Sequence, residues 1–113
     1  MPTMRIAAGK TQPGATDWQV YNPTNASPPE GITVVVDTTS GKFNGVPVYV
    51  ASLGGRGGHF RTTGGSSIYA ATSNSFAIYL RWAEQTPNMP DLTPALANDP
   101  IYEYHILWHG IEE

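Results

Sequence analysis

The end of the chain constrains the fold most. Residues 102–112 read YEYHILWHGIE, an aromatic and β-branched run without proline, which is typical of a β-strand. Side chains of a strand alternate between its two faces. One face would carry Tyr102, Tyr104, Ile106 and Trp108. The other would carry Glu103, His105, Leu107, His109 and Ile111. The first face predicts a core; the second has ionisable groups that a sealed interior would not tolerate unpaired, so it predicts water or a partner subunit.

The rest of the chain has the composition of an all-β protein. Glycine and proline are abundant (12 and 10 residues), only 13% of residues are charged, and no long amphipathic helix is visible. Short runs rich in Val, Ile, Tyr and Thr lie between turn residues and predict strands at 4–11, 18–21, 32–37, 46–53 and 75–82, with 59–63 and 66–71 as short strand candidates broken by Gly64-Gly65. Together with the closing strand, we expect a single domain over residues 1–113, an antiparallel β-sandwich of six to seven strands.

Two segments interrupt this strand pattern. Residues 22–31 contain three prolines with Asn, Thr and Ser, and predict a surface loop of the kind that often carries binding residues. Residues 83–101 contain prolines at 87, 90, 94 and 100. Within that segment, Thr93 followed by Pro94 predicts an N-capped helical turn over 93–98. A connection this long in a small domain is usually functional or forms an interface.

Composition excludes several classes of function. The formal charge is −3 with no block of Lys or Arg, so we expect no nucleic-acid partner. No apolar run approaches the roughly 20 residues needed to cross a bilayer. The start, MPTMRIAAGK, has no apolar core of a signal peptide, which predicts cytoplasmic synthesis with a virion or a non-classical extracellular destination. The chain has no cysteine, which excludes disulfides, thiol catalysis and cysteine-based zinc sites.

Catalytic motifs are missing from the sequence. Nothing matches the G-x-S-x-G elbow of serine hydrolases. The run GGRGGHFRTTGG lacks the Gly-Lys-Ser/Thr of a phosphate-binding loop and precedes no helix, so a flexible connection between strands is the simpler interpretation. We therefore predict that the chain is not an enzyme.

The two histidines of the closing strand are the candidate metal ligands. His105 and His109 lie four residues apart on one face, and so about 13 Å apart at about 3.3 Å per residue, which is too far to hold one ion within a chain. Three copies of one histidine around a three-fold axis would be close enough. The alternative is that both are hydrogen-bonded interface residues, and we otherwise expect no cofactor.

An aromatic and polar set suggests a sugar ligand. Trp82 and Tyr102 with the loop 22–31 would combine rings that stack on apolar C–H patches with amides and carboxylates that bond hydroxyl groups. The alternative is that Trp82 ends the core stripe that begins at Phe76. Composition leaves the two interpretations open.

One family shares much of this order of residues. The relevant positions are Gly9-Lys10, Trp18, Phe43, the Pro47 strand, Ser67-Ile68-Tyr69, Ser75-Phe76 and the closing run from Tyr102 to Glu112. Over nearly its whole length the chain resembles the H-type lectin domain of snail agglutinins and slime-mould discoidins. It is also similar to modules found in phage tail fibres and in bacterial proteins of unknown role.

The resemblance implies a six-stranded antiparallel β-sandwich that forms a parallel trimer and binds N-acetylgalactosamine or galactose between protomers. Carried over by position, the family's ligand-binding tyrosine falls on Tyr102 and its aromatic residue on Trp82. Its arginine falls on Thr63, with Arg61 two residues away on the same expected strand. In the loop 22–31, the nearest polar candidates are Asn25 and Glu30.

Two hypotheses follow. The first is a homotrimeric lectin-like module that binds cell-surface or secreted glycans. The second is a structural trimer of a virus particle, a phage decoration or tail-fibre-tip protein, whose partners are capsid or tail proteins. In both, the His105 and His109 face of the closing strand would form the inner wall of the trimer, with Tyr102 at its mouth.

Overall fold

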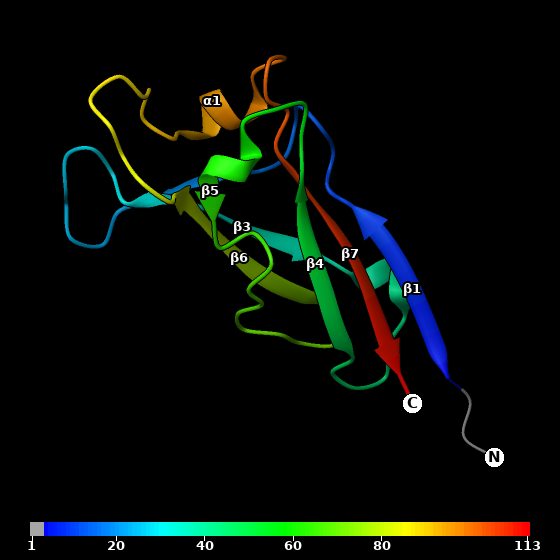
Figure 1. Cartoon of the computed structure of the whole chain (residues 1–113). Helices are drawn as coiled ribbons and strands as arrows, with labels where there is room; N and C mark the ends of the chain where they lie inside the picture. Colours follow the sequence, from blue (N-terminus) through cyan, green and yellow to red (C-terminus); the bar gives the residue numbers. More distant parts are fainter. Residues whose placement is uncertain (1–3) are drawn as a thin grey trace.

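The computed structural model describes residues 4–113 and shows an all-β chain with two antiparallel sheets (Figure 1). One sheet has the strand order β1-β7-β4, with bounds Arg5–Lys10, His105–Glu112 and Val48–Gly54. The other has the order β2-β3-β6-β5, with bounds Gln19–Tyr21, Gly31–Asp37, Ser75–Trp82 and Thr62–Thr63. The all-β prediction is confirmed.

One hydrophobic core collects side chains from both sheets. The inner face of the four-stranded sheet supplies Ile32, Val34, Val36, Phe76, Ile78, Leu80 and Trp82. The three-stranded sheet supplies Tyr49, Ala51, Ile106 and Trp108. The ring centroids of Tyr49 and Phe76 lie 4.8 Å apart and join the two layers. Full burial of one such side chain contributes about 1.5–3 kcal/mol to folding. The two sheets therefore pack with their apolar faces together, in a two-layer, sandwich-like arrangement.

The closing strand is shorter than predicted. It begins at His105, because Glu103 has a left-handed backbone (φ 47°) and the amides of Tyr102 and Glu103 both donate to the Asp99 carbonyl at 2.9 Å. Tyr102 therefore lies in a turn, not on a strand face. Tyr104, also outside the strand, is fully buried as expected. Burial, and secondarily the neighbouring Tyr102, raise the pKa of the Tyr104 phenol to about 12.

Two other strand predictions hold only in part or not at all. Of residues 59–63 only Thr62–Thr63 form a strand, β5; His59–Arg61 form a 3-10 helix, η2, after Gly58 (φ 75°), so Arg61 does not share a strand with Thr63. The segment 66–71 makes only an isolated bridge between Tyr69 and Ala77. Glycines with a positive φ angle interrupt the predicted strands. Gly58 precedes η2, and Gly64, which separates 59–63 from 66–71, adopts φ 103° at a position where a side chain would collide with the Tyr79 carbonyl.

The proline-rich segment closes one end of the sheets. It contains the helix α1 (Pro94–Asn98), whose N-cap Thr93 accepts a hydrogen bond from the Leu96 amide at 3.1 Å, as predicted. Leu92 and Ala97 are buried in the core. The α1 end, η2 and the loops on either side gather at what we term the tip (Figure 1). Among the described residues, no helix is long and apolar enough to cross a membrane.

Candidate functional site

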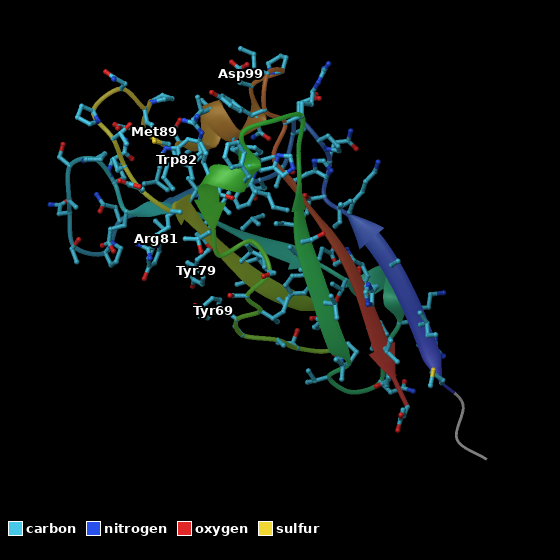
Figure 2. The ribbon with its side chains drawn as sticks, in the orientation of Figure 1. Tyr69, Tyr79, Arg81, Trp82, Met89 and Asp99 are labelled. Carbon is cyan, nitrogen blue, oxygen red and sulfur yellow. The ribbon has the colours of Figure 1, made fainter. Side chains whose placement is uncertain are left out.

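Five of the six predicted sugar-site residues line one of two concave regions, and two of them, Glu30 and Trp82, also line a third hollow of about 230 Å³ together. Arg61, Trp82 and Tyr102 come together in a hollow of about 280 Å³ at the tip. We define this tip hollow by its lining residues, Gly58, Phe60, Arg61, Trp82, Asn88, Met89, Pro90 and Tyr102. Trp82 and Met89 mark its place in Figure 2.

Glu30 and Thr63 line a larger groove of about 630 Å³ on the outer face of the four-stranded sheet. This tyrosine groove is formed by Tyr21, Glu30, Gly31, Thr63, Gly64, Ser67, Tyr69, Tyr79, Leu80 and Arg81. Asn25 lies in the exposed loop with φ 60° and lines neither region. The structure thus groups three of the predicted residues, places two elsewhere and leaves one apart.

The helix η2 positions the polar side of the tip hollow. The Arg61 amide donates to the Gly58 carbonyl at 3.1 Å, and the Arg61 carbonyl accepts from the Ala83 amide at 2.7 Å. These bonds hold the short helix against the end of β6. The guanidinium carbon of Arg61 lies 5.5 Å from the ring centroid of Phe60, whose side chain is 83% exposed. A cation and an aromatic face therefore lie side by side at the rim.

Trp82 forms part of the floor of the tip hollow. It is only 8% exposed, and its indole N–H donates to the Pro90 carbonyl at 2.9 Å. Its packing matches the interpretation as the end of the core stripe, so within this chain it offers little surface for a sugar to stack on. The exposed aromatic residue of the hollow is Phe60, which the sequence analysis does not single out because it predicts a strand over 59–63. Its position within a glycine-rich run is the sequence signal that would have identified it.

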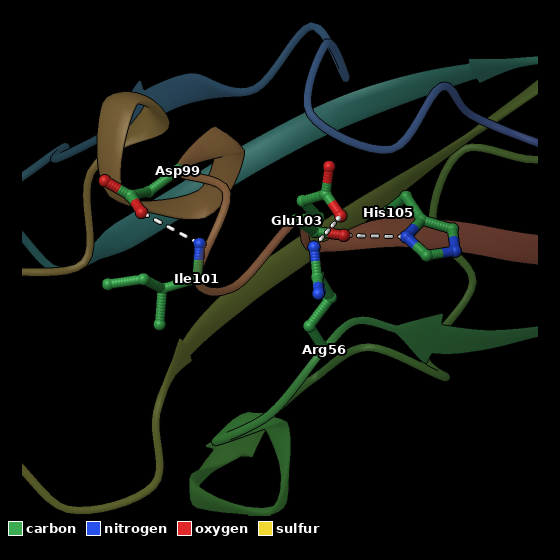
Figure 3. Close-up of polar contacts among 5 residues, drawn as sticks. All are labelled: Arg56, Asp99, Ile101, Glu103 and His105. Atoms are coloured by element: carbon green, nitrogen blue, oxygen red, sulfur yellow. Dashed lines mark hydrogen bonds and ion pairs between the residues drawn. The ribbon is translucent and has the colours of Figure 1, made fainter.

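The turn that carries Tyr102 is held by several contacts. The Arg56 amide donates to the Tyr102 carbonyl at 2.8 Å, and the Arg56 side chain lies 3.7 Å from the Glu103 carboxylate (Figure 3). The ring centroids of Tyr102 and Tyr104 are 5.4 Å apart. Tyr102 is half-buried, so one edge of its ring faces the hollow while the other packs on the core.

The two candidate metal ligands both lie on the outer face of β7. The Nδ1–H of His105 donates to the Glu103 carbonyl at 2.7 Å, and its Nε2 lies over Gly54. His109 is exposed between Ala8 and Val50 of the neighbouring strands. Across residues 4–113, no group of three His, Asp or Glu side chains could hold a metal ion. A shared ion would therefore need copies of the chain.

The same outer face of the three-stranded sheet is aliphatic. Strand register places Ile6, Ile111 and Val48 in one row, and Ala8, His109 and Val50 in the next. Ile6 and Val48 are 64% and 70% exposed, and Leu107 on the following row is 40% exposed. We refer to this surface as the aliphatic face.

Comparison with known proteins adds no relative to this picture: no protein-family model, curated protein or solved structure matches the chain.

Proposed function

We propose that the chain is a homotrimeric, H-type lectin-like module that binds carbohydrate, of the galactose and N-acetylgalactosamine type or another surface glycan, at the tip hollow. The observation that carries the proposal is that Arg61, Trp82 and Tyr102, which are distant in sequence, line one hollow. By position, the resemblance assigns ligand contacts to Trp82 and Tyr102, and Arg61 is the arginine two residues from Thr63, on which the family's arginine falls.

The hollow has the chemistry that a pyranose needs. The exposed face of Phe60 suits the apolar C–H patch of a sugar ring. The Arg61 guanidinium donates hydrogen bonds, and the Asn88 amide both donates and accepts them. Met89 and the floor of Trp82 add apolar contact. A shallow site of this size supports weak binding of one sugar unit, so avidity from several copies would matter.

The aliphatic face supports the proposed trimer. Aliphatic side chains that are in register across three strands and exposed in the single chain form the kind of contiguous patch that marks a protein interface. Around a three-fold axis, β7 of each copy would meet its equivalents. The tip hollow lies at the end of the sheets, away from this face, so the proposed trimer would leave it open.

A glycan array tests this proposal with a matched pair of variants. Arg61→Gln removes the guanidinium that lines the hollow, whereas Arg5→Gln makes the same change on an exposed arginine of β1 that lines neither concave region. Because a hydrogen bond to a charged group contributes about 1.5–3 kcal/mol, we expect Arg61→Gln to weaken binding tenfold or more and Arg5→Gln to leave it unchanged. A protein that stays trimeric yet binds nothing on the array would refute the proposal.

A structural trimer of a virus particle is the second candidate. The aliphatic face favours it, because this surface supports assembly whether or not a sugar binds. This function predicts a stable trimer that binds no glycan but associates with purified particles. Failure of the protein to bind such particles would count against it.

A further inference from the structure

Three tyrosines build the centre of the groove on the outer face of the four-stranded sheet. Tyr79 of β6 lies between Tyr21 and Tyr69, with ring centroids 4.8 Å and 4.9 Å away and interplanar angles of 70° and 85°. The flanking rings thus stand nearly perpendicular to the central ring. Tyr69 reaches this position through its backbone bridge to Ala77 (Figure 2).

The hydroxyl groups of these tyrosines are not used by the fold. Tyr49 and Tyr104, in the core, donate to the carbonyls of Thr72 and Gly57 at 2.7 Å and 3.1 Å. Across residues 4–113, the hydroxyls of Tyr21, Tyr69 and Tyr79 have no such partner. Three hydroxyls that have no partner in the described part of the chain and that line one groove are therefore available to hydrogen-bond a ligand.

Arg81 adds a positive charge at the same place. It lies opposite Thr63 of β5. On its other side is Gly31 of β3, where a Cβ atom would lie only 3.3 Å from the Cβ of Arg81. Within residues 4–113 its guanidinium has no ion pair. Glu30, the one carboxylate that lines the groove, has an oxygen that accepts from the Thr24 hydroxyl at 2.6 Å and from the Thr24 amide at 3.3 Å. Glu30 is thus held by its own loop.

From this geometry we infer that the tyrosine groove is a second saccharide site, separate from the tip hollow, and that it takes saccharides with an acidic group. The tyrosine rings form the walls for a sugar ring, and the acidic group pairs with Arg81. Every polar side chain of the lining except Glu30 can donate a hydrogen bond, since the hydroxyls of the tyrosines, Thr63 and Ser67 donate as well as accept and the Arg81 guanidinium only donates. A donor-rich groove matches an acceptor-rich ligand, such as a carboxylate or a sulfate ester.

The groove remains open in the proposed assembly. It lies on the outer face of the four-stranded sheet, whereas the aliphatic face lies on the outer side of the other sheet. Each protomer would present its groove outward. The inference stands without sugar binding at the tip hollow, because the two regions share no lining residue.

The test is binding of the full-length protein to three matched sets of immobilised glycans: neutral, carboxylate-bearing and sulfated. A proline-rich peptide is included because tyrosine-lined grooves also bind such peptides. We expect acidic glycans to bind at least tenfold more tightly than neutral ones, with affinity falling as salt is raised. Whether the carboxylated or the sulfated set binds better identifies the acidic group. Preference for neutral glycans, for the peptide, or for none of the probes would overturn the inference.

Two variants locate the binding. Tyr69→Ala removes a wall whose side chain is 51% exposed, and the backbone bridge to Ala77 stays intact, so folding should be kept. Arg81→Gln removes the charge alone. We expect Tyr69→Ala to weaken binding of all groove ligands, and Arg81→Gln to abolish the preference for acidic over neutral glycans; Arg5→Gln is the control. An unchanged preference in Arg81→Gln would contradict the assignment. Binding that also survives Arg61→Gln would separate this site from the tip hollow.

Discussion

The two sheets bury similar faces and expose contrasting ones. Inward, both present large apolar side chains to one core. Outward, the three-stranded sheet shows aliphatic rows such as Ile6, Ile111 and Val48. The outer face of the four-stranded sheet shows tyrosines and an arginine. Stability needs only the inward faces, so the outward difference points to two separate roles. We propose self-association for the first face and a saccharide site, separate from the tip hollow, for the second.

The largest expected effect comes from placing a charge on each outer face. Val48 is 70% exposed on the three-stranded sheet and Val35 is 69% exposed on the four-stranded sheet. Val48→Asp should convert the proposed trimer to a monomer, because assembly would bury three unpaired carboxylates near the axis. Val35→Asp should leave the trimer intact. Multi-angle light scattering measures the oligomeric state of both variants. A trimer that persists in Val48→Asp would show that the aliphatic face is not the interface.

A second effect concerns the floor of the tyrosine groove. Gly31 is buried, and a side chain there would collide with the Leu80 carbonyl, whereas one at Gly57 would meet no atom within 4 Å. Gly31→Ala should lower the free energy of unfolding by about 1–3 kcal/mol through overpacking. Gly57→Ala should change it by less than about 0.5 kcal/mol. Denaturant unfolding tests this pair, and equal stabilities would show that the strands do not approach as described.

A third comparison separates tyrosines that support the fold from those that face the groove. The Tyr49 hydroxyl lies 2.6 Å from that of the fully buried Thr38. Tyr49→Phe leaves this polar group unpaired and should cost about 1–3 kcal/mol. Tyr79→Phe should change stability by less than about 0.5 kcal/mol, because its hydroxyl supports no contact in the described residues. If Tyr79→Phe lowers the free energy of unfolding as much as Tyr49→Phe does, the Tyr79 hydroxyl supports the fold and is not free to bind a ligand.

The smallest effect lies at the C-terminal end of β7, the central strand of the three-stranded sheet. The Glu112 carboxylate accepts from the amides of Asn44 and Gly45, and these bonds, in that order, lower its pKa. A lowered folded pKa gives stability that is complete above the unfolded value of about 4.3 and is lost as pH falls through the folded value. Glu112→Gln should flatten this part of the acid-unfolding profile. Identical profiles for the two proteins would contradict the role of the carboxylate.

Sequence patterns predicted the strands whose inner faces are buried. The alternation over 75–82 matches β6 at both ends, and Thr93-Pro94 located the start of α1. The prediction failed in the glycine-rich run, where positive φ at Gly58 and Gly64 replaced strand by turns. Period-two alternation does not reveal such backbone choices.

The site was harder to predict than the fold. Tyr21, Tyr69 and Tyr79 come from three distant segments, and only the strand register brings them together. The sequence predicts Tyr102 on a strand, whereas in the structure the turn at Glu103 places it at the tip hollow. The metal hypothesis for His105 and His109 and the trimer remain predictions, because both depend on contacts between copies.

The most direct test of the central claim is a nitrogen–proton NMR spectrum of the intact protein titrated with N-acetylgalactosamine. The Trp82 indole N–H, bonded to the Pro90 carbonyl at the floor of the tip hollow, is the reporter, and Trp108, in the core beside Gly9, is the internal control. Sugar binding at the tip hollow predicts a saturable shift of the Trp82 indole signal, with the Trp108 signal unchanged. No shift at Trp82 at saturating sugar, or shifts confined to the aliphatic face, would contradict it.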